Sequence, residues 1–187
     1  VHAGDLSRAA SRFEQYLGQY PADREARNEL AGVLIRQERY AEVPQLYVGV
    51  KPDYDAHLLL MSAYSLDDNY EAAEAQSRQV LAEHPGDVKA EKLLADILNK
   101  KKNTIQAQEL YERLAQQAGA DLSVRVRLGQ VYLLQHNFSK ALDQFLLAMA
   151  AGLKSPDVYQ GFVDAAAAAP AVALTPDVQA IAEGIYT

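Results

Sequence analysis

Four histidines are the residues of this chain best suited to bind a metal ion or to exchange a proton near neutral pH. His2, His57, His84 and His136 lie far apart in the sequence, without the short spacing of a metal-ligand set. We expect His57 to be a core residue, His136 to lie in a turn and His84 to lie at a helix end. The chain has no cysteine, which excludes disulfides, cysteine zinc sites and thiol nucleophiles. It has no phosphate-binding loop or nucleotide fingerprint either, so we expect no cofactor and no catalysis.

The charged residues favour a solvated, acidic surface. The formal net charge is −7, which argues against nucleic acid as a partner because phosphate binding needs a basic face. The exception is the run Lys100, Lys101 and Lys102, with Lys89 and Lys92 nearby. This run is either a solvated turn or a contact for an acidic partner, such as an anionic polysaccharide. No stretch approaches the roughly 20 apolar residues that span a bilayer, so we expect no membrane insertion.

A repeat runs through the chain and must position these residues. Three columns share its steps of 34, 30, 34 and 34 residues, as far as each column extends. They are an aromatic column (Phe13, Tyr47, Tyr111 and Phe145, with Ser77 at the missing place), a small-residue column (Ala9, Val43, Ala73, Ala107 and Ala141) and a leucine column (Leu30, Leu60, Leu94 and Leu128). A fixed period of this size is typical of a stacked array of short units.

The best-formed unit covers residues 122–155 and predicts two helices joined by a tight turn. Its first half has apolar residues at helical spacing. Asn137 is the expected N-cap of the second helix, and Gly152 is the expected stop after it.

This unit resembles the tetratricopeptide repeat, a family of antiparallel helix pairs. The resemblance rests on Leu128, Gly129, Tyr132, Phe138, Ala141, Phe145 and Ala148. It implies an all-α fold, an α-solenoid of antiparallel helix pairs wound into a right-handed superhelix. In such a fold Gly129 and Ala141 let two helices approach closely, while the aromatic residues fill the wedge between successive pairs.

The resemblance predicts a single array over residues 1–187. Its parts are a half repeat with a second helix only (5–23), a shortened repeat (24–53), three full repeats (54–87, 88–121 and 122–155) and irregular C-terminal or capping helices (156–187). The unpartnered first helix predicts further sequence upstream. Pro170 is expected to end one helix, and Thr175 with Pro176 to begin a last one.

The shortened repeat lacks four residues after Tyr47. We expect its second helix to end about a turn early, with Pro44 near its beginning. The shortening either changes the local curvature of the array or forms a notch for a partner.

In tetratricopeptide arrays the first helices line a concave groove in which peptides or partner helices dock. The resemblance therefore implies these groove candidates: Asn28, Gly32, Ile35, Leu58, Ser62, Ser65, Lys92, Asp96, Asn99, Val126, Gln130 and Leu133. We expect a groove of mixed character. It is not the carboxylate clamp of cochaperone members, because Asp96 stands where that clamp needs asparagine and would repel the ligand.

These expectations favour a non-enzymatic scaffold that binds another protein, either a peptide, a helix or an enzyme of the same assembly. The chain is similar to the long repeat arrays of bacterial envelope assembly and exopolysaccharide export, which implies a periplasmic location. Two alternatives stay open. One is a cytoplasmic peptide-binding chaperone or adaptor, and the other is a module for anionic polysaccharide centred on Lys92 and Lys100 to Lys102.

Overall fold

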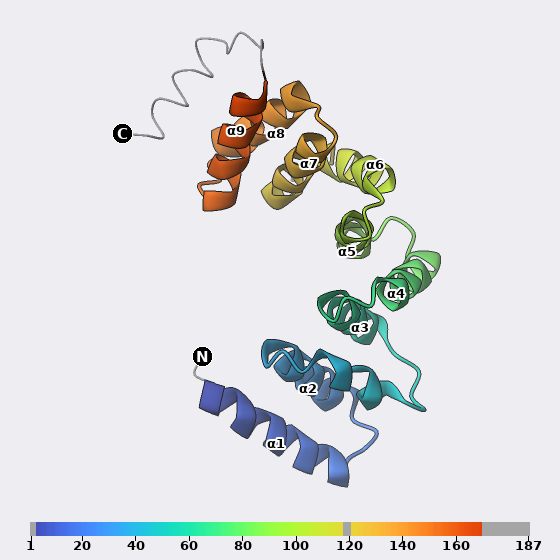
Figure 1. The fold of residues 1–187 in the computed structure, drawn as a ribbon. Helices are drawn as coiled ribbons and strands as arrows, with labels where there is room; N and C mark the ends of the chain where they lie inside the picture. Colours follow the sequence, from blue (N-terminus) through green and yellow to red (C-terminus); the bar gives the residue numbers. More distant parts are fainter. Residues whose placement is uncertain (1–2, 118–120, 170–187) are drawn as a thin grey trace. The chain divides into compact units, whose positions relative to one another are not determined.

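The structure is a computed structural model that describes residues 3–117 and 121–169. The regular elements of these residues are all helices, without a strand among them (Figure 1). They are α1 (Ala3–Gln19), α2 (Arg24–Arg36), η1 (Tyr40–Glu42), η2 (Pro44–Tyr47), α3 (Tyr54–Leu66), α4 (Tyr70–Glu83), α5 (Val88–Lys100), α6 (Thr104–Ala115), α7 (Leu122–Leu134), α8 (Phe138–Ala150) and α9 (Pro156–Ala168), where η denotes a 3-10 helix.

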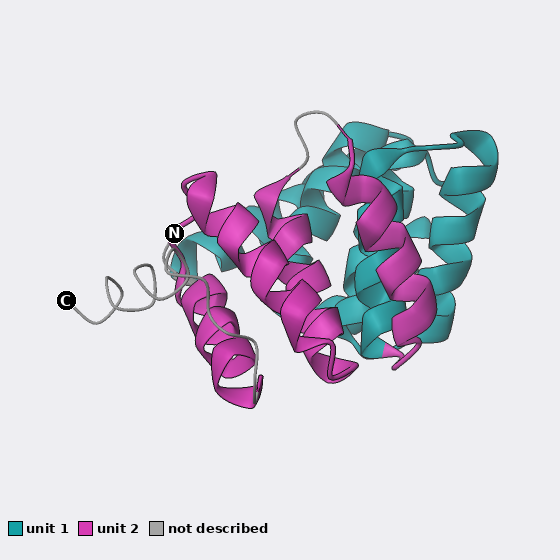
Figure 2. Cartoon of the chain, turned by 90° about the horizontal axis from the view of Figure 1, so that it is seen from above, with its two compact units in different colours: residues 1–100 teal, residues 101–187 magenta. Residues whose placement is uncertain are grey.

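The chain forms two compact units, Val1–Lys100 and Lys101–Thr187 (Figure 2). Within unit 1, α1 packs on α2, α2 on α3, α3 on α4 and α4 on α5. Within unit 2, α6 packs on α7, α7 on α8, and α9 on both α7 and α8. Each unit is therefore a stack of consecutive antiparallel helices, which confirms the all-α solenoid. The boundary falls inside the predicted repeat 88–121, between its first helix α5 and its second helix α6.

Aspartates at the repeat period begin the first helices. Asp23 and Asp53 accept hydrogen bonds from the backbone N–H of Ala26 and Ala56, both at 2.9 Å. Asp87 accepts from the Ala90 N–H in the same way, and Asp121 accepts from the Ser123 N–H, one residue nearer, at the start of α7. Each cap satisfies a backbone donor that the first helical turn leaves unpaired. Their steps of 30, 34 and 34 residues reproduce the repeat, including its short member.

A left-handed turn residue recurs at the same period between the paired helices. Glu38, Asp68, Lys102 and His136 all have positive φ, between 57° and 65°. This conformation reverses the chain after the first helix, and the predicted cap Asn137 then accepts from the Lys140 N–H. Asn69 does the same for α4. The predicted stop at Gly152 is confirmed by its φ of 92°.

The three repeat columns form the cores of the two units. Every member is buried except Ala9 and Phe13, which lie on α1 and stay partly exposed. Phe145 shows how tightly the column packs. A Cβ atom added to Gly129 would lie 2.8 Å from its ring, and one added to Gly161 would lie 2.4 Å away. The close approach predicted at Gly129 is thus confirmed, and Gly161 on α9 provides a second one that sequence analysis missed.

The predicted second helix of the shortened repeat is wrong. The segment instead forms two 3-10 turns, η1 and η2, in which Val43 N–H donates to Tyr40 C=O at 3.1 Å. Pro44 lacks the N–H that an α-helix needs there, and the short segment ends at Gly49 with a φ of 75°. Val43 and Tyr47 are buried nevertheless, so the core columns continue without a regular helix.

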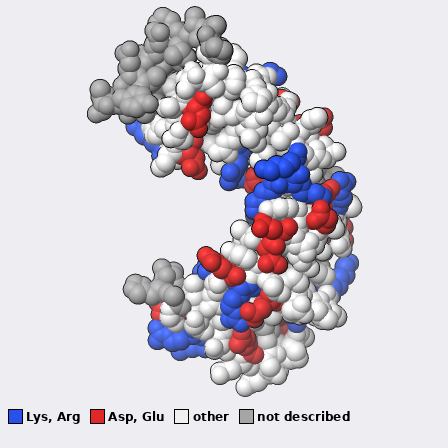
Figure 3. Space-filling view, viewed as in Figure 1, with Lys and Arg blue, Asp and Glu red and all other residues white. Residues whose placement is uncertain are grey.

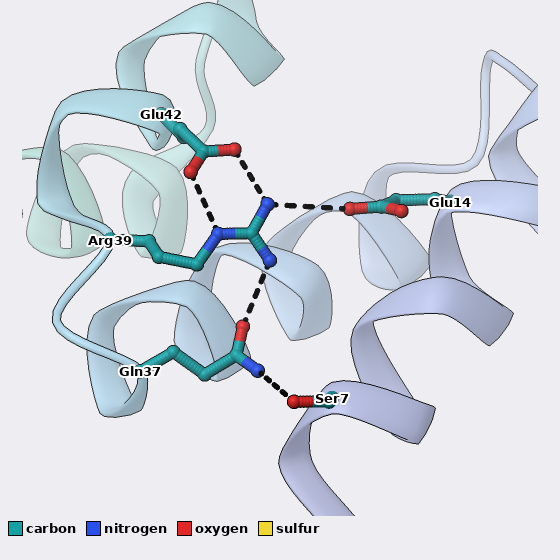
Figure 4. A network of polar contacts seen from close by, with 5 residues as sticks. All are labelled: Ser7, Glu14, Gln37, Arg39 and Glu42. Carbon is teal, nitrogen blue, oxygen red and sulfur yellow. Dashed lines mark hydrogen bonds and ion pairs between the residues drawn. The ribbon is translucent and has the colours of Figure 1, made fainter.

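A polar network fixes this irregular segment to α1 (Figure 4). The Arg39 guanidinium makes two hydrogen bonds to the Glu42 carboxylate, both at 2.7 Å. It also donates to Gln37 at 3.1 Å, and Gln37 donates to Ser7 of α1 at 3.2 Å. Glu14 of α1 lies 3.8 Å from Arg39. The bidentate geometry is the strong form of this pairing, so the network replaces some of the order that a helix would supply.

At the other end of the chain, α9 is the first helix that sequence analysis expected after residue 156. Its buried residues are Val158, Gly161, Phe162 and Ala165. The expected stop at Pro170 and the last helix from Thr175 lie outside the described residues.

Candidate binding groove

A groove of about 710 Å³ lies between α2 and α3 in unit 1. Its lining residues are Arg24, Glu25, Asn28, Glu29, Gly32, Asp53, Asp55, Leu58, Leu59 and Ser62. Residues three and four apart share one face of a helix, and for this reason α2 and α3 each present a continuous strip to the groove. The structure brings together Asn28, Gly32, Leu58 and Ser62 of the predicted groove. Binding of a partner to them stays a prediction.

The floor of the groove is held by hydrogen bonds between Tyr47, Asn28 and Asp53. The Tyr47 hydroxyl donates to Asn28 Oδ1 at 2.8 Å, and Asn28 Nδ2 donates to Asp53 Oδ1 at 3.2 Å. Burial and the nearby Asp53 charge raise the pKa of Tyr47, so the phenol stays protonated and keeps donating. Because Asp53 also caps α3, this network ties the shortened repeat to the helix after it.

Acidic side chains dominate the groove. It contains four carboxylates, of Glu25, Glu29, Asp53 and Asp55, and a single guanidinium, of Arg24. Figure 3 shows acidic side chains gathered over α2 and α3. Glu25, Glu29 and Asp55 are solvent-exposed, and the ion pairs found among the described residues do not involve them.

Sequence analysis expected a groove of mixed character and did not single out these carboxylates. The signal was present: Glu25 and Asp55 stand three residues before the projected positions Asn28 and Leu58, which is one helical turn earlier on the same face.

The remaining groove candidates do not line this groove. Ile35 is half-buried against the core of unit 1, and Ser65 is buried. On α5, Lys92, Asp96 and Asn99 are half-buried.

On α7 in unit 2, Gln130 and Leu133 are half-buried, whereas Val126 is only 7% exposed. Val126 is thus a packing residue and offers little surface to a partner. Gln130 accepts a hydrogen bond from Arg127 at 3.3 Å.

The lysines proposed for an anionic contact have different surroundings. Lys100 donates to the Ser65 carbonyl at 2.9 Å, near the end of α3, and lies 5.7 Å from the centre of the Tyr70 ring. This position suits a cation, because the C-terminal end of a helix carries partial negative charge. Lys89 and Lys102 are exposed and Lys101 is half-buried. Lys100 therefore has a structural role, and an anionic contact at the other lysines stays a prediction.

The histidines lie where the sequence placed them. His57 is buried, with Nδ1 2.7 Å from Gln76 Oε1. His84 follows α4 with its ring edge-on to Tyr54, and His136 is a turn residue. His2 lies outside the described residues.

Within residues 3–117 and 121–169, no three histidine, aspartate or glutamate side chains gather as a metal site. The helices of this part of the chain are all too short or too polar to cross a membrane.

Unit 2 contains a second hollow, of about 610 Å³, which sequence analysis missed. Four of its polar side chains form hydrogen bonds with one another or with the backbone. Tyr132 donates to Glu112, which lowers the pKa of that carboxyl. Arg125 donates to Gln144 at 3.3 Å and to the Ala115 carbonyl at 3.1 Å. Such mutual pairing is typical of a structural network.

The family model for the tetratricopeptide repeat matches residues 1–47. No curated protein sequence matches the chain. Solved structures share its fold: a tetratricopeptide repeat protein from Parabacteroides merdae is 17% identical with a TM-score of 0.69, and the superposition covers 87% of this chain and 65% of that one. The present chain therefore spans less than two thirds of that relative.

Two further structures are similar over most of both chains. MamA of strain AMB-1 is 20% identical with a TM-score of 0.69, covering 87% of this chain and 89% of MamA. A thermophilic TPR protein of Thermus thermophilus is 18% identical with a TM-score of 0.68, covering 88% of this chain and 92% of that one. At such identities the likeness defines the fold alone. That fold is the tetratricopeptide-repeat solenoid.

Proposed function

We propose that this chain is a non-enzymatic scaffold that binds another protein in the groove between α2 and α3. The main support is the groove itself, which is lined by two consecutive first helices and joined across Asn28 and Asp53 by a hydrogen bond. The tetratricopeptide-repeat fold supports it, because that fold is typical of protein-binding scaffolds. A chain of similar fold was solved as part of the APC/C hetero-tetramer Cut9-Hcn1.

Site-specific photo-crosslinking tests this proposal. A photoreactive amino acid at Leu58 reports on the groove, and the same amino acid at Gln79, an exposed position of α4, is the control. In cells of the source organism, we expect Leu58 to cross-link to one defined segment of a partner protein and Gln79 not to do so. Equal products at both positions, or none at Leu58, would contradict the proposal.

The finer proposal places this scaffold in a bacterial periplasmic assembly linked to exopolysaccharide export or secretion. Its support is the resemblance of the repeat sequence to such arrays; the absence of cysteine is compatible with this compartment and equally with the cytoplasm. Fractionation of cells that express the full-length native protein tests it, since recovery in the cytoplasmic fraction would favour the adaptor alternative.

The polysaccharide alternative depends on the exposed Lys89 and Lys102. Titration with an anionic polysaccharide at low and at physiological salt tests it. Unchanged binding after Lys89 and Lys102 are both replaced by glutamine, with Lys100 kept because it bonds the end of α3, would reject this alternative.

A further inference from the structure

We propose that the groove between α2 and α3 selects a partner segment that carries lysine or arginine, and that Glu25, Glu29 and Asp55 hold its cationic side chains. This inference rests on the proposed function and adds the chemistry of the partner.

The groove between α2 and α3 has an excess of negative charge. With four carboxylates against one guanidinium, the groove has a formal excess of three negative charges. Like charges brought together at an interface disfavour binding, whereas opposite charges favour and orient it. An acidic peptide, a free terminal carboxylate or an acidic polysaccharide is therefore disfavoured here, and a basic segment is favoured.

Three of the four groove carboxylates are accessible to a ligand cation. Glu25, Glu29 and Asp55 are exposed and take part in none of the ion pairs found within residues 3–117 and 121–169. A ligand cation can bind them without breaking an internal ion pair. Asp53 differs, since it already accepts from Asn28 and from the α3 backbone. We therefore assign recognition to the three exposed carboxylates and a positioning role to Asp53.

The volume and the apolar lining of the groove restrict the kind of segment that fits. A volume of about 710 Å³ is within the range of pockets that enclose a drug-sized ligand, so it has room for a few residues of an extended chain. Gly32 leaves open space, because a Cβ added there would meet no atom within 4 Å. Leu58 and Leu59 are half-buried and provide an apolar strip beside the acidic one. The segment that fits carries a basic residue next to an apolar one.

Selection from a random peptide library displayed on phage, with the full 187-residue chain as bait, tests the inference. The key variant is Glu25→Gln, Glu29→Gln, Asp55→Asn, which removes three charges and keeps the side-chain shapes. The matched control is Asp67→Asn, Glu83→Gln, Glu109→Gln, three exposed carboxylates outside the groove lining. Circular dichroism confirms that both variants fold.

We expect the enriched peptides to contain lysine or arginine beside an apolar residue. Synthetic copies should bind the groove variant about tenfold more weakly than the parent, while the control changes less than about twofold. Enrichment of neutral or acidic peptides would overturn the cationic inference and leave the proposed protein-binding function standing. Equal loss in both variants, or no enrichment, would also overturn it. Spermidine is a competitor in the same assay. If it displaced the peptides as well as an unlabelled peptide does, a general cation site would replace a peptide site.

Discussion

Repeat 54–87 in unit 1 and repeat 122–155 in unit 2 fill the same internal space in opposite ways. In repeat 122–155 the first helix contributes Gly129 and the second contributes the Phe145 ring, which lies against that glycine. The corresponding places in repeat 54–87, 68 residues earlier, hold Met61 and Ser77. All four residues are buried. The large side chain is thus on the second helix in repeat 122–155 and on the first helix in repeat 54–87.

This exchange explains why the aromatic column can lose a member without loss of the repeat. Close packing constrains the summed volume between two helices more strongly than the identity of either residue. We infer that Met61 supplies the bulk that Ser77 lacks. The Ser77 hydroxyl donates to the Ala73 carbonyl at 2.9 Å. A column therefore has to be interpreted together with the facing column.

The largest effect should come from removing the Phe145 ring. We expect Phe145→Ala to lower the free energy of unfolding by about 3–5 kcal/mol, because the resulting cavity is bordered by Gly129 and Gly161, which have no side chains to refill it. Ser77→Ala in the other repeat removes one buried hydrogen bond and should change it by about 1 kcal/mol or less. Urea denaturation, with hydrogen exchange to locate the affected helices, measures both. Similar losses at the two positions would contradict the proposed exchange of bulk.

A double-mutant cycle tests the exchange directly. Gly129→Met alone should cost about 1–3 kcal/mol by overpacking, and Phe145→Ser alone should leave a cavity. The double variant copies the pair Met61 and Ser77, so we expect it to be more stable than the sum of the single losses predicts, by about 1–3 kcal/mol. Additive losses would show that the two repeats have independent packing solutions.

Much of the fold could be predicted from the sequence because its repeating contacts are local. The paired helices, the cap at Asn137 and the stop at Gly152 follow from residue types at fixed spacing. The segment after Arg39 could not be predicted in this way, since Pro44 interrupts helical hydrogen bonding there and Arg39 pairs both with Glu42 of the segment and with Glu14 of α1. Val43 and Tyr47 are buried at helical spacing. The sequence pattern therefore still predicts an α-helix where the chain forms two 3-10 turns.

The candidate groove was partly predictable. The resemblance placed Asn28, Gly32, Leu58 and Ser62 among the groove candidates, and these four line the groove between α2 and α3. The acidic positions could have been found one helical turn before the projected ones on the same face. That these carboxylates take part in none of the ion pairs found among the described residues is visible only in the three-dimensional arrangement. Val126 illustrates the reverse error, since its position in the pattern matches the groove but its side chain is buried.

A smaller effect is expected at the aspartate caps. Asp87 accepts from Ala90 N–H at 2.8 Å and from the Tyr54 hydroxyl at 2.8 Å. Burial alone would raise the pKa of this carboxyl, but these hydrogen bonds outweigh burial and the net shift is downward. We expect Asp87→Ala to cost about 1–2 kcal/mol at neutral pH.

The lowered pKa also sets a pH dependence. The contribution of Asp87 is complete above its unfolded pKa of about 4 and is lost as the pH falls through the folded value. Asp87→Asn keeps a capping oxygen without the charge, so its stability relative to the parent should improve as the pH falls below about 4. A constant difference in thermal melts between neutral and strongly acidic pH would contradict this assignment.

The smallest effects should show that the two repeats are alike in their backbone even though they differ in packing. Asp68 and His136 hold the same turn position with φ of 57° and 59°, a region that glycine adopts more readily than other residues. We expect Asp68→Gly and His136→Gly each to raise the free energy of unfolding by about 0.5 kcal/mol. Gly152→Ala, at a φ of 92°, is the opposite control and should lower it by about 1 kcal/mol. Equal gains at Asp68 and His136 would mean that the turn is set by the repeat and is independent of which helix provides the bulk. A gain at one position only would show that the exchange of Met61 and Ser77 for Gly129 and Phe145 also alters the backbone.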